Sequence, residues 1–227
     1  MSAPSSPRTP PAAFLGLLLV ALVACWPSLG SLGAGLLSDD AVALGYVHRA
    51  EGVLLDWTGP QCGLSSVRFW RPLVTTSLAL QEHWTGADPV PLRLFNLLAH
   101  ALAALLLVGV GRRLGLGWPG ALLGGLLAAL YPDQGGTVTW IVGRVDSLTA
   151  PLFLGALWAC LAGRSLLAAP LALLACSSKE IAFVLPLWAL ACAWGSGLGL
   201  RAACSRCLPL IGAVLLAFLL RRLALGV

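Results

Sequence analysis

The sequence predicts an all-α integral membrane protein, and two observations support this prediction. Charged residues make up 10% of the 227 positions and hydrophobic residues 59%, with a mean hydropathy of +0.90. A soluble domain of this composition would lack the polar surface that keeps it dissolved. The apolar runs are also continuous and rich in Leu and Ala, without the period-two alternation of barrel strands. Since backbone groups in lipid must satisfy one another, continuous runs predict helices.

About seven apolar segments are expected to cross the membrane: 13–37, 92–110, 118–131, 148–162, 166–176, 181–194 and 208–220. Several are shorter than the roughly 20 residues that span a bilayer, so their flanks must contribute or the helices end inside the protein. The first segment predicts an uncleaved helix rather than a signal peptide, because it continues past Cys25. Residues 1–12, rich in Pro and Ser, predict a disordered cytoplasmic tail, and 13–227 a single polytopic membrane domain.

The stretch 38–91 is polar enough to form a long non-cytoplasmic first loop that carries amphipathic surface helices. Its first part, 39–52, is the best candidate for such a helix. Trp57, Trp70 and Trp84 are spaced along the loop as expected for residues at the water–lipid boundary. A separate soluble domain is disfavoured, because about fifty residues rarely supply a sufficient core.

The arginine distribution predicts the orientation, because short cytoplasmic loops carry an excess of basic residues. With the N-terminus in the cytoplasm, the inner side receives Arg8, Arg112, Arg113, Arg164, Arg201 and Arg206. Arg221 and Arg222 do not fit this pattern if all seven segments cross. Four short polar segments then meet on the non-cytoplasmic side: 39–40, 71–72, 143–146 and 178–180. Ionisable groups held at a membrane boundary indicate a functional site.

The adjacent carboxylates Asp39 and Asp40 have two interpretations. Their mutual repulsion can raise one pKa and make that group a base, or the pair can hold a divalent cation. They can also simply cap the surface helix that follows. Asn96 and His100 are four residues apart on one helix face, so they can hydrogen-bond each other or point into a cavity. No metal site is assigned elsewhere.

Three cations accompany these acids. Arg71 presents a planar fork suited to phosphate, although an interfacial arginine can also extend beside an aromatic ring. Arg144 and Asp146 are two residues apart and can pair with each other. Lys179 needs an anionic partner, which is either Glu180 or a ligand. Together they suit an anionic, lipid-linked substrate and a base that activates an acceptor.

These motifs occur in a characteristic order. It begins with the acidic pair and the Trp-Arg-Pro-Leu of 70–73, followed by Asn96 with His100. The Trp-Ile-Val-Gly-Arg-Val-Asp of 140–146 and the Ser-Lys-Glu of 178–180 with Pro186 complete it. The order resembles the GT-C membrane glycosyltransferases, and most closely the protein O-mannosyltransferase-like branch whose members often carry tetratricopeptide repeats. The resemblance covers roughly residues 36–190 and only the N-terminal module of such enzymes.

The resemblance implies transfer of a mannose-like sugar from a polyprenyl- or dolichyl-phosphate carrier to a protein or glycan acceptor on the non-cytoplasmic face. It implies a plasma membrane location in a prokaryote and the endoplasmic reticulum in a eukaryote. Asp39 and Asp40 would supply the catalytic carboxylate. The carrier phosphate would be held by Arg71, Arg144 and Lys179. Supporting roles would fall to Asn96, His100, Asp133, Asp146 and Glu180.

Three positions differ from the family pattern: Tyr131 and Arg93 replace histidines, and Gly136 replaces a glutamate that Asp133 could partly substitute. Two other functions therefore remain open. One is a truncated or degenerate, non-catalytic relative that acts as a scaffold. The other is a small transporter whose path is lined by charged residues. Membrane lipid is an expected partner. Nucleic acid is not, because no basic run with interleaved aromatics occurs.

Overall fold

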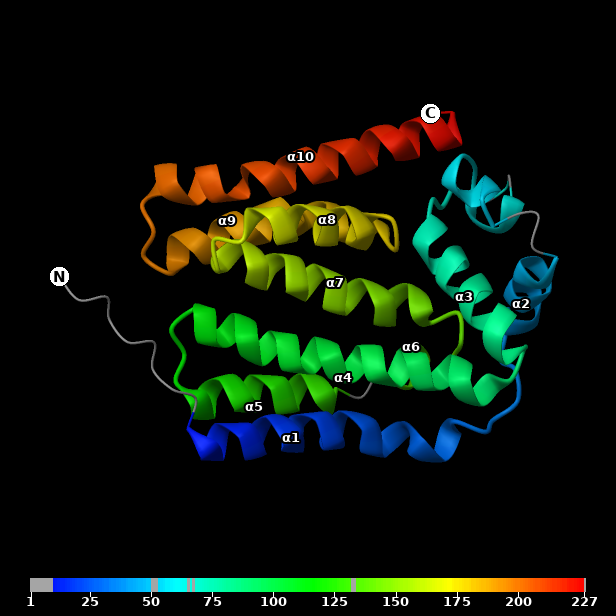
Figure 1. Ribbon diagram of the computed structural model, residues 1–227, viewed down its shortest axis with the longest axis horizontal. Coiled ribbons are helices and arrows are strands. Elements are labelled where there is room, and N and C mark those ends of the chain that lie inside the picture. Colours follow the sequence, from blue (N-terminus) through cyan, green and yellow to red (C-terminus); the bar gives the residue numbers. More distant parts are fainter. Residues whose placement is uncertain (1–9, 50–52, 65, 67, 132–133, 227) are drawn as a thin grey trace.

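The computed structural model describes residues 10–49, 53–64, 66, 68–131 and 134–226. Every regular element in these residues is helical, as the sequence predicts. Figure 1 shows the long helices stacked side by side, while α2 (Asp40–His48) and α3 (Pro72–Thr85) lie across one end of the stack. The chain therefore forms a helical bundle with a small helical layer at one end.

The bundle helices lie at the positions of the seven apolar segments. They are α1 (Pro11–Cys25) with the 3-10 turn η1 (Trp26–Ser31), α4 (Pro89–Arg113), α5 (Trp118–Ala129), α7 (Arg144–Leu161), α8 (Ser165–Cys176), η4 (Glu180–Val184) with α9 (Leu185–Gly195), and α10 (Leu200–Leu225). Among the described residues, three of these helical segments are long and apolar enough to cross a membrane, namely α1 with η1, α4 and α10. The others are shorter or more polar, so seven crossings remain a prediction.

Small residues bring the helices close together. The core between α7, α8, α9 and α10 is made largely of buried alanines, among them Ala156, Ala172 and Ala189. Such small side chains let helix backbones approach in lipid, where packing rather than water exclusion holds helices together. At the α4–α5 contact, a Cβ added to Gly125 would lie 2.4 Å from Val108 Cγ2 and 3.2 Å from the Ala104 carbonyl oxygen. This contact therefore requires glycine.

The stretch 38–91 folds onto the end of the bundle. The predicted surface helix is shorter than 39–52, because α2 ends at His48. Two 3-10 turns, η2 (Leu55–Trp57) and η3 (Gln61–Gly63), connect it to α3. A buried cluster of Leu44, Val47, Val74, Leu78, Leu92, Ile141 and Val145 joins α2 and α3 to α4 and the start of α7. Trp84 is 79% exposed but Trp70 only 1%, so the Trp70 ring contacts protein and not water or lipid.

The charges divide between the two ends of the bundle. We call the end that carries α2 and α3 the polar end. All the described acids lie at or near it: Asp39, Asp40, Asp56, Glu82, Asp88, Asp146 and Glu180. We call the opposite end, where α4 ends and α10 begins, the arginine end; it carries Arg112, Arg113, Arg164, Arg201 and Arg206. Arg221 lies at the polar end, where its Nη2 donates to the Arg68 carbonyl oxygen over 3.2 Å.

Small element α6 (Gln134–Val138) completes the chain between α5 and α7. It is followed by a tight turn at 139–143. The backbone around Gly143 leaves no space there for a side chain. A Cβ on Gly143 would lie 2.5, 2.7 and 2.8 Å from the carbonyl oxygens of Gly136, Thr137 and Trp140. This turn reaches the polar end and carries part of the candidate site.

Candidate functional site

A cavity of about 380 Å³ lies at the polar end. Each of the four polar segments singled out in the sequence contributes to its wall, through Asp39, Arg71, Asp146 and Lys179. Trp140, apolar residues of α2 and α7, and parts of the 61–71 loop also line it. Residues more than a hundred positions apart thus face one space.

The two adjacent carboxylates have different surroundings. Asp40 is fully buried, and its two oxygens accept hydrogen bonds from the backbone N–H groups of Leu37 (2.9 Å) and Val142 (3.0 Å). Asp39 occupies the N-cap position of α2 but makes no capping hydrogen bond, and its exposed side chain lines the cavity. Asp40 therefore ties the start of α2 to the 139–143 turn, whereas the Asp39 carboxylate faces the cavity.

Arg71 pairs with Glu180 across 109 positions of sequence. Its Nη2 and Nε atoms donate to Glu180 Oε2 over 2.8 and 3.2 Å. The guanidinium carbon also lies 4.0 Å from the centre of the Phe69 ring, a cation–π distance that steadies the side chain. The Arg71 side chain is 14% exposed, so its remaining donors can still reach the cavity.

Lys179 pairs with Asp146, with Nζ 2.5 Å from Oδ1. The simpler local pairs, Arg144 with Asp146 and Lys179 with Glu180, are therefore not the ones formed. Arg144 and Asp146 share the first turn of α7, where side chains two residues apart point to different sides. Each acid instead meets a cation from another part of the chain.

Arg144 lies in the interior and not in the cavity wall. It is fully buried, and its guanidinium carbon lies 4.2 Å from the centre of the Phe95 ring. Its nitrogens donate to Asn96 Oδ1, Gln81 Oε1 and the carbonyl oxygens of Ser77 and Leu92, over distances between 2.5 and 3.3 Å. These bonds join α3, α4 and α7 beneath the site.

Asn96 and His100 do not hydrogen-bond each other. The Asn96 amide donates to the carbonyl oxygens of Trp140 (3.0 Å) and Ile141 (3.2 Å), which fixes the 139–143 turn. His100 Nε2 lies 3.3 Å from the Ala129 carbonyl oxygen, and its ring lines a second cavity. The sequence left open a mutual hydrogen bond or side chains that point into a cavity, and the second alternative is correct for His100.

This second cavity, of about 580 Å³, adjoins the first. Asp146 and Lys179 line both cavities, so their ion pair stands at the boundary between them. The second cavity is otherwise lined mostly by apolar side chains of α4, α7 and η4, among them Leu107 and Phe153. A charged cavity thus meets an apolar one.

Two buried donors near these cavities lack a partner among the described residues. They are Trp140 Nε1, in the lining of the first cavity, and Ser147 Oγ, in the lining of the second. Buried polar groups in folded proteins are normally paired, so an unpaired one that lines a cavity is a candidate ligand contact.

Arg93 contributes to the site in a way that the sequence did not indicate. It is fully buried and donates to the carbonyl oxygens of Leu32, Ala34, Gly35 and Thr139. These bonds hold the segment that precedes Asp39 against the 139–143 turn. Its position inside an otherwise apolar helix was the available signal, since a buried arginine must find several acceptors.

Asp56 is the second residue that sequence reasoning missed. It is fully buried and accepts hydrogen bonds from Tyr46 Oη (2.7 Å), Thr75 Oγ1 (2.6 Å) and the Cys62 backbone N–H (3.0 Å). Burial, followed by the Asp56 hydrogen bond, raises the pKa of Tyr46 above its ordinary value. Burial and the nearby carboxylates of Asp56 and Asp39 raise the pKa of Cys62 to about 11.

The remaining expected residues add little to the geometry. Asp133 lies outside the described residues. Within the described part of the chain, no group of three or more His, Cys, Asp or Glu side chains is placed to hold a metal ion. Both Asp40 oxygens are taken up by backbone N–H groups, so the Asp39–Asp40 pair offers a cation one free carboxylate.

These features describe an all-helical membrane protein with a charged cavity beside an apolar one. The chain is similar to the protein O-mannosyl-transferase Tmtc1 of Drosophila melanogaster, with 32% identity over 134 residues. The match covers 56% of this chain and 16% of the length of that relative. No family model matches the chain, and no solved structure matches it. The similarity supports a glycosyltransferase-like interpretation.

Proposed function

We propose that the chain carries a glycosyltransferase site that moves a mannose-like sugar from a polyprenyl- or dolichyl-phosphate carrier to a hydroxyl group of a protein or glycan. The observation that carries the proposal is the meeting of Asp39, Arg71 and Lys179 at one cavity with an apolar cavity next to it. The similarity to an O-mannosyl-transferase supports the sugar and the reaction type.

Asp39 is the proposed base. The acceptor oxygen bonds to the anomeric carbon while the bond from that carbon to the carrier phosphate oxygen breaks, with inversion. The proton of the acceptor passes to the Asp39 carboxylate, and the bonding electron pair leaves with the phosphate. Asp39 suits this role because its side chain is exposed, lines the cavity and caps no helix.

Arg71 and Lys179 are the proposed phosphate ligands. A guanidinium has five N–H donors and an ammonium three, so one carboxylate partner leaves donors over on each. Both ion pairs are partly exposed, which lets a phosphate share or replace the carboxylate. The two cations would then stabilise the negative charge that develops on the leaving phosphate.

The buried contacts of Arg144 favour a positioning role for this residue rather than direct phosphate contact. Through Asn96 it supports the 139–143 turn, whose Val142 N–H binds Asp40. The isoprenoid chain of the carrier would lie in the apolar cavity beyond Lys179, alongside His100 and Phe153. In this proposal the polar end faces the non-cytoplasmic side, in the plasma membrane or the endoplasmic reticulum.

The proposal is tested by radiolabelled sugar transfer from a polyprenyl-phosphate donor in membranes that contain the chain. Asp39→Asn should lower transfer by about 10²-fold or more, because it removes the base. Glu82→Gln is the matched control: Glu82 is an acid of the same end, paired with His48 and absent from the cavity wall. It should leave transfer unchanged. Equal transfer by the wild type and Asp39→Asn would contradict the proposed role of Asp39 as the base.

A non-catalytic scaffold is the second candidate function, and one observation favours it. Arg93 stands where the family pattern has histidine, and its side chain is fully engaged with backbone carbonyls. It therefore holds the backbone and offers nothing to a substrate. No transfer by the wild-type chain, together with retained donor binding, would favour the scaffold.

A further inference from the structure

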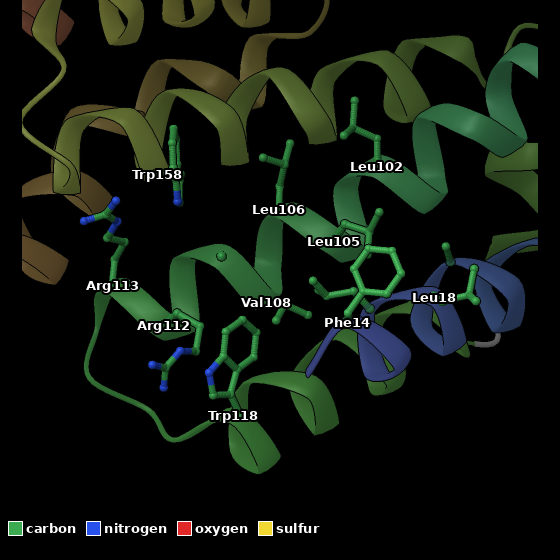
Figure 2. A pocket seen from close by; sticks show the side chains of 13 residues that line it. Phe14, Leu18, Leu102, Leu105, Leu106, Val108, Arg112, Arg113, Trp118 and Trp158 are labelled. Carbon is green, nitrogen blue, oxygen red and sulfur yellow. The ribbon is translucent and has the colours of Figure 1, made fainter. Parts of the chain in front are cut away.

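Another cavity lies at the arginine end, away from the proposed transferase site. It has a volume of about 790 Å³ and lies between α1, α4, the start of α5 and α7. Figure 2 shows Phe14 and Leu18 of α1 on one wall and Leu105 and Leu106 of α4 beside them. We call it the arginine-end cleft.

The walls of the arginine-end cleft are apolar and open to the outside of the bundle. Phe14 is 69% exposed, and Leu18 and Leu102 are each 50% exposed. From Leu102 to Arg113 the cleft follows twelve residues of α4, which span about 16 Å at the rise of an α-helix. That length is about half the ~30 Å hydrocarbon thickness of a bilayer, so the cleft matches one leaflet.

The mouth of the cleft carries arginines held by tryptophans. The Arg112 guanidinium carbon lies 4.6 Å from the centre of the Trp118 ring, and that of Arg113 lies 5.4 Å from the Trp158 ring (Figure 2). Arg164 approaches the same Trp158 ring at 5.2 Å. Tryptophans are enriched at the water–lipid boundary, and stacked guanidiniums still present N–H groups to a phosphate.

Among the described residues, no acid forms an ion pair with these arginines. The sequence has no Asp or Glu between Asp88 and Asp133, between Asp146 and Glu180, or after Glu180. The ion pairs found among the described residues all lie at the polar end. A concentration of positive charge above an apolar, leaflet-long cleft calls for an anion that carries a hydrocarbon chain.

We propose that the arginine-end cleft binds one anionic glycerophospholipid. Its phosphate lies between Arg112 and Arg113, and one acyl chain lies along α4 against Phe14 and Leu18. Gly109 shapes the wall, because a Cβ there would lie 3.1 Å from Trp158 Cδ1 and would press the indole away from the helix. The bound lipid joins α1 to α4 and α7 at the end opposite the proposed catalytic cavity.

The test uses the purified chain in lipid nanodiscs of phosphatidylcholine with phosphatidylglycerol, followed by native mass spectrometry of the lipids that stay bound. The wild type should retain phosphatidylglycerol in preference to phosphatidylcholine. The double variant Arg112→Gln with Arg113→Gln should lower that retention about tenfold or more, because charge-assisted hydrogen bonds are lost. Arg201→Gln is the control: this exposed arginine lies at the same end but not in the cleft, and retention should not change.

A second variant tests the acyl chain separately. Ala21→Phe places a ring in the cleft and keeps both arginines, so retention should fall while circular dichroism shows an unchanged helix content. Equal retention of the two lipids by the wild type would overturn the proposal. So would undiminished retention in the double variant, or displacement of the lipid by inorganic phosphate alone, which would show a simple anion site.

Discussion

Both ends of the bundle place cations beside an apolar cavity, but the groups that contact those cations differ. At the polar end, Arg71 and Lys179 each have a carboxylate partner from another helix, and Arg144 is buried among acceptors. At the arginine end, Arg112 and Arg113 stack on tryptophan rings. The partner therefore decides the role, since a carboxylate orients a cation within a site and a ring leaves its charge available.

The comparison also separates function from stability. Within the polar end, fully buried groups such as Asp40 and Arg93 bind backbone and hold the frame, while Asp39 faces the cavity. At the arginine end the charged residues are exposed or half-buried, and their removal should cost little stability. Four measurements test this contrast.

Arg144→Met should destabilise the fold by about 3 kcal/mol, because the buried Asn96 Oδ1 and the half-buried Gln81 Oε1 lose their donor. Chemical unfolding in detergent micelles measures the loss. Arg164→Met, an exposed arginine at the other end, should change the unfolding free energy by less than about 0.5 kcal/mol. Equal losses for the two variants would show that the ends do not differ.

Gly143→Ala should cost about 1–3 kcal/mol, because its Cβ would press on three carbonyl oxygens that cannot move independently. The same change at Gly212, inside α10 with no atom within 4 Å of the added Cβ, should be neutral or slightly stabilising. Thermal unfolding of the two variants compares them directly. A stable Gly143→Ala protein would contradict the tight 139–143 turn.

The coupling between Arg71 and Glu180 should be about 1 kcal/mol in a double-mutant cycle with Arg71→Gln and Glu180→Gln. The coupling between Lys179 and Asp146 should be smaller, at about 0.5 kcal/mol or less, because water screens the more exposed pair. The four unfolding free energies of each cycle give the result. The reverse order would mean that burial does not set the strength of these pairs.

The Cys62 thiol should react slowly with iodoacetamide at pH 8, and its rate should rise as the pH approaches about 11. The raised pKa means that the native state holds this proton more tightly than the unfolded chain does. The contribution of Cys62 to stability is therefore full below pH 9 and is lost as the pH rises through about 11. Peptide mass spectrometry follows the labelling, with the exposed Cys204 as reference. Asp56→Asn should speed the reaction, and an unchanged rate would contradict the role of that carboxylate.

Much of the fold could be predicted from composition and pattern. The helical class follows from continuous apolar runs, and the helices lie where those runs lie. The meeting of residues 39, 71, 146 and 179 at one cavity follows from the alternation of chain direction. The ends of α2 and the burial of Trp70 could not be predicted, because both depend on how the 38–91 stretch packs on its neighbours.

The amino-acid sequence alone specifies helices suited to lipid, with acids in the segments at one end of the bundle and a group of arginines in the segments at the other. Those features need only hydrophobicity and the order of segments along the chain. Which charges meet depends on how the helices pack: Asp146 binds Lys179, Glu180 binds Arg71, and Arg144 is buried. The reason is geometric: neighbours in a turn point apart, and a side chain's partner depends on which helix packs against it.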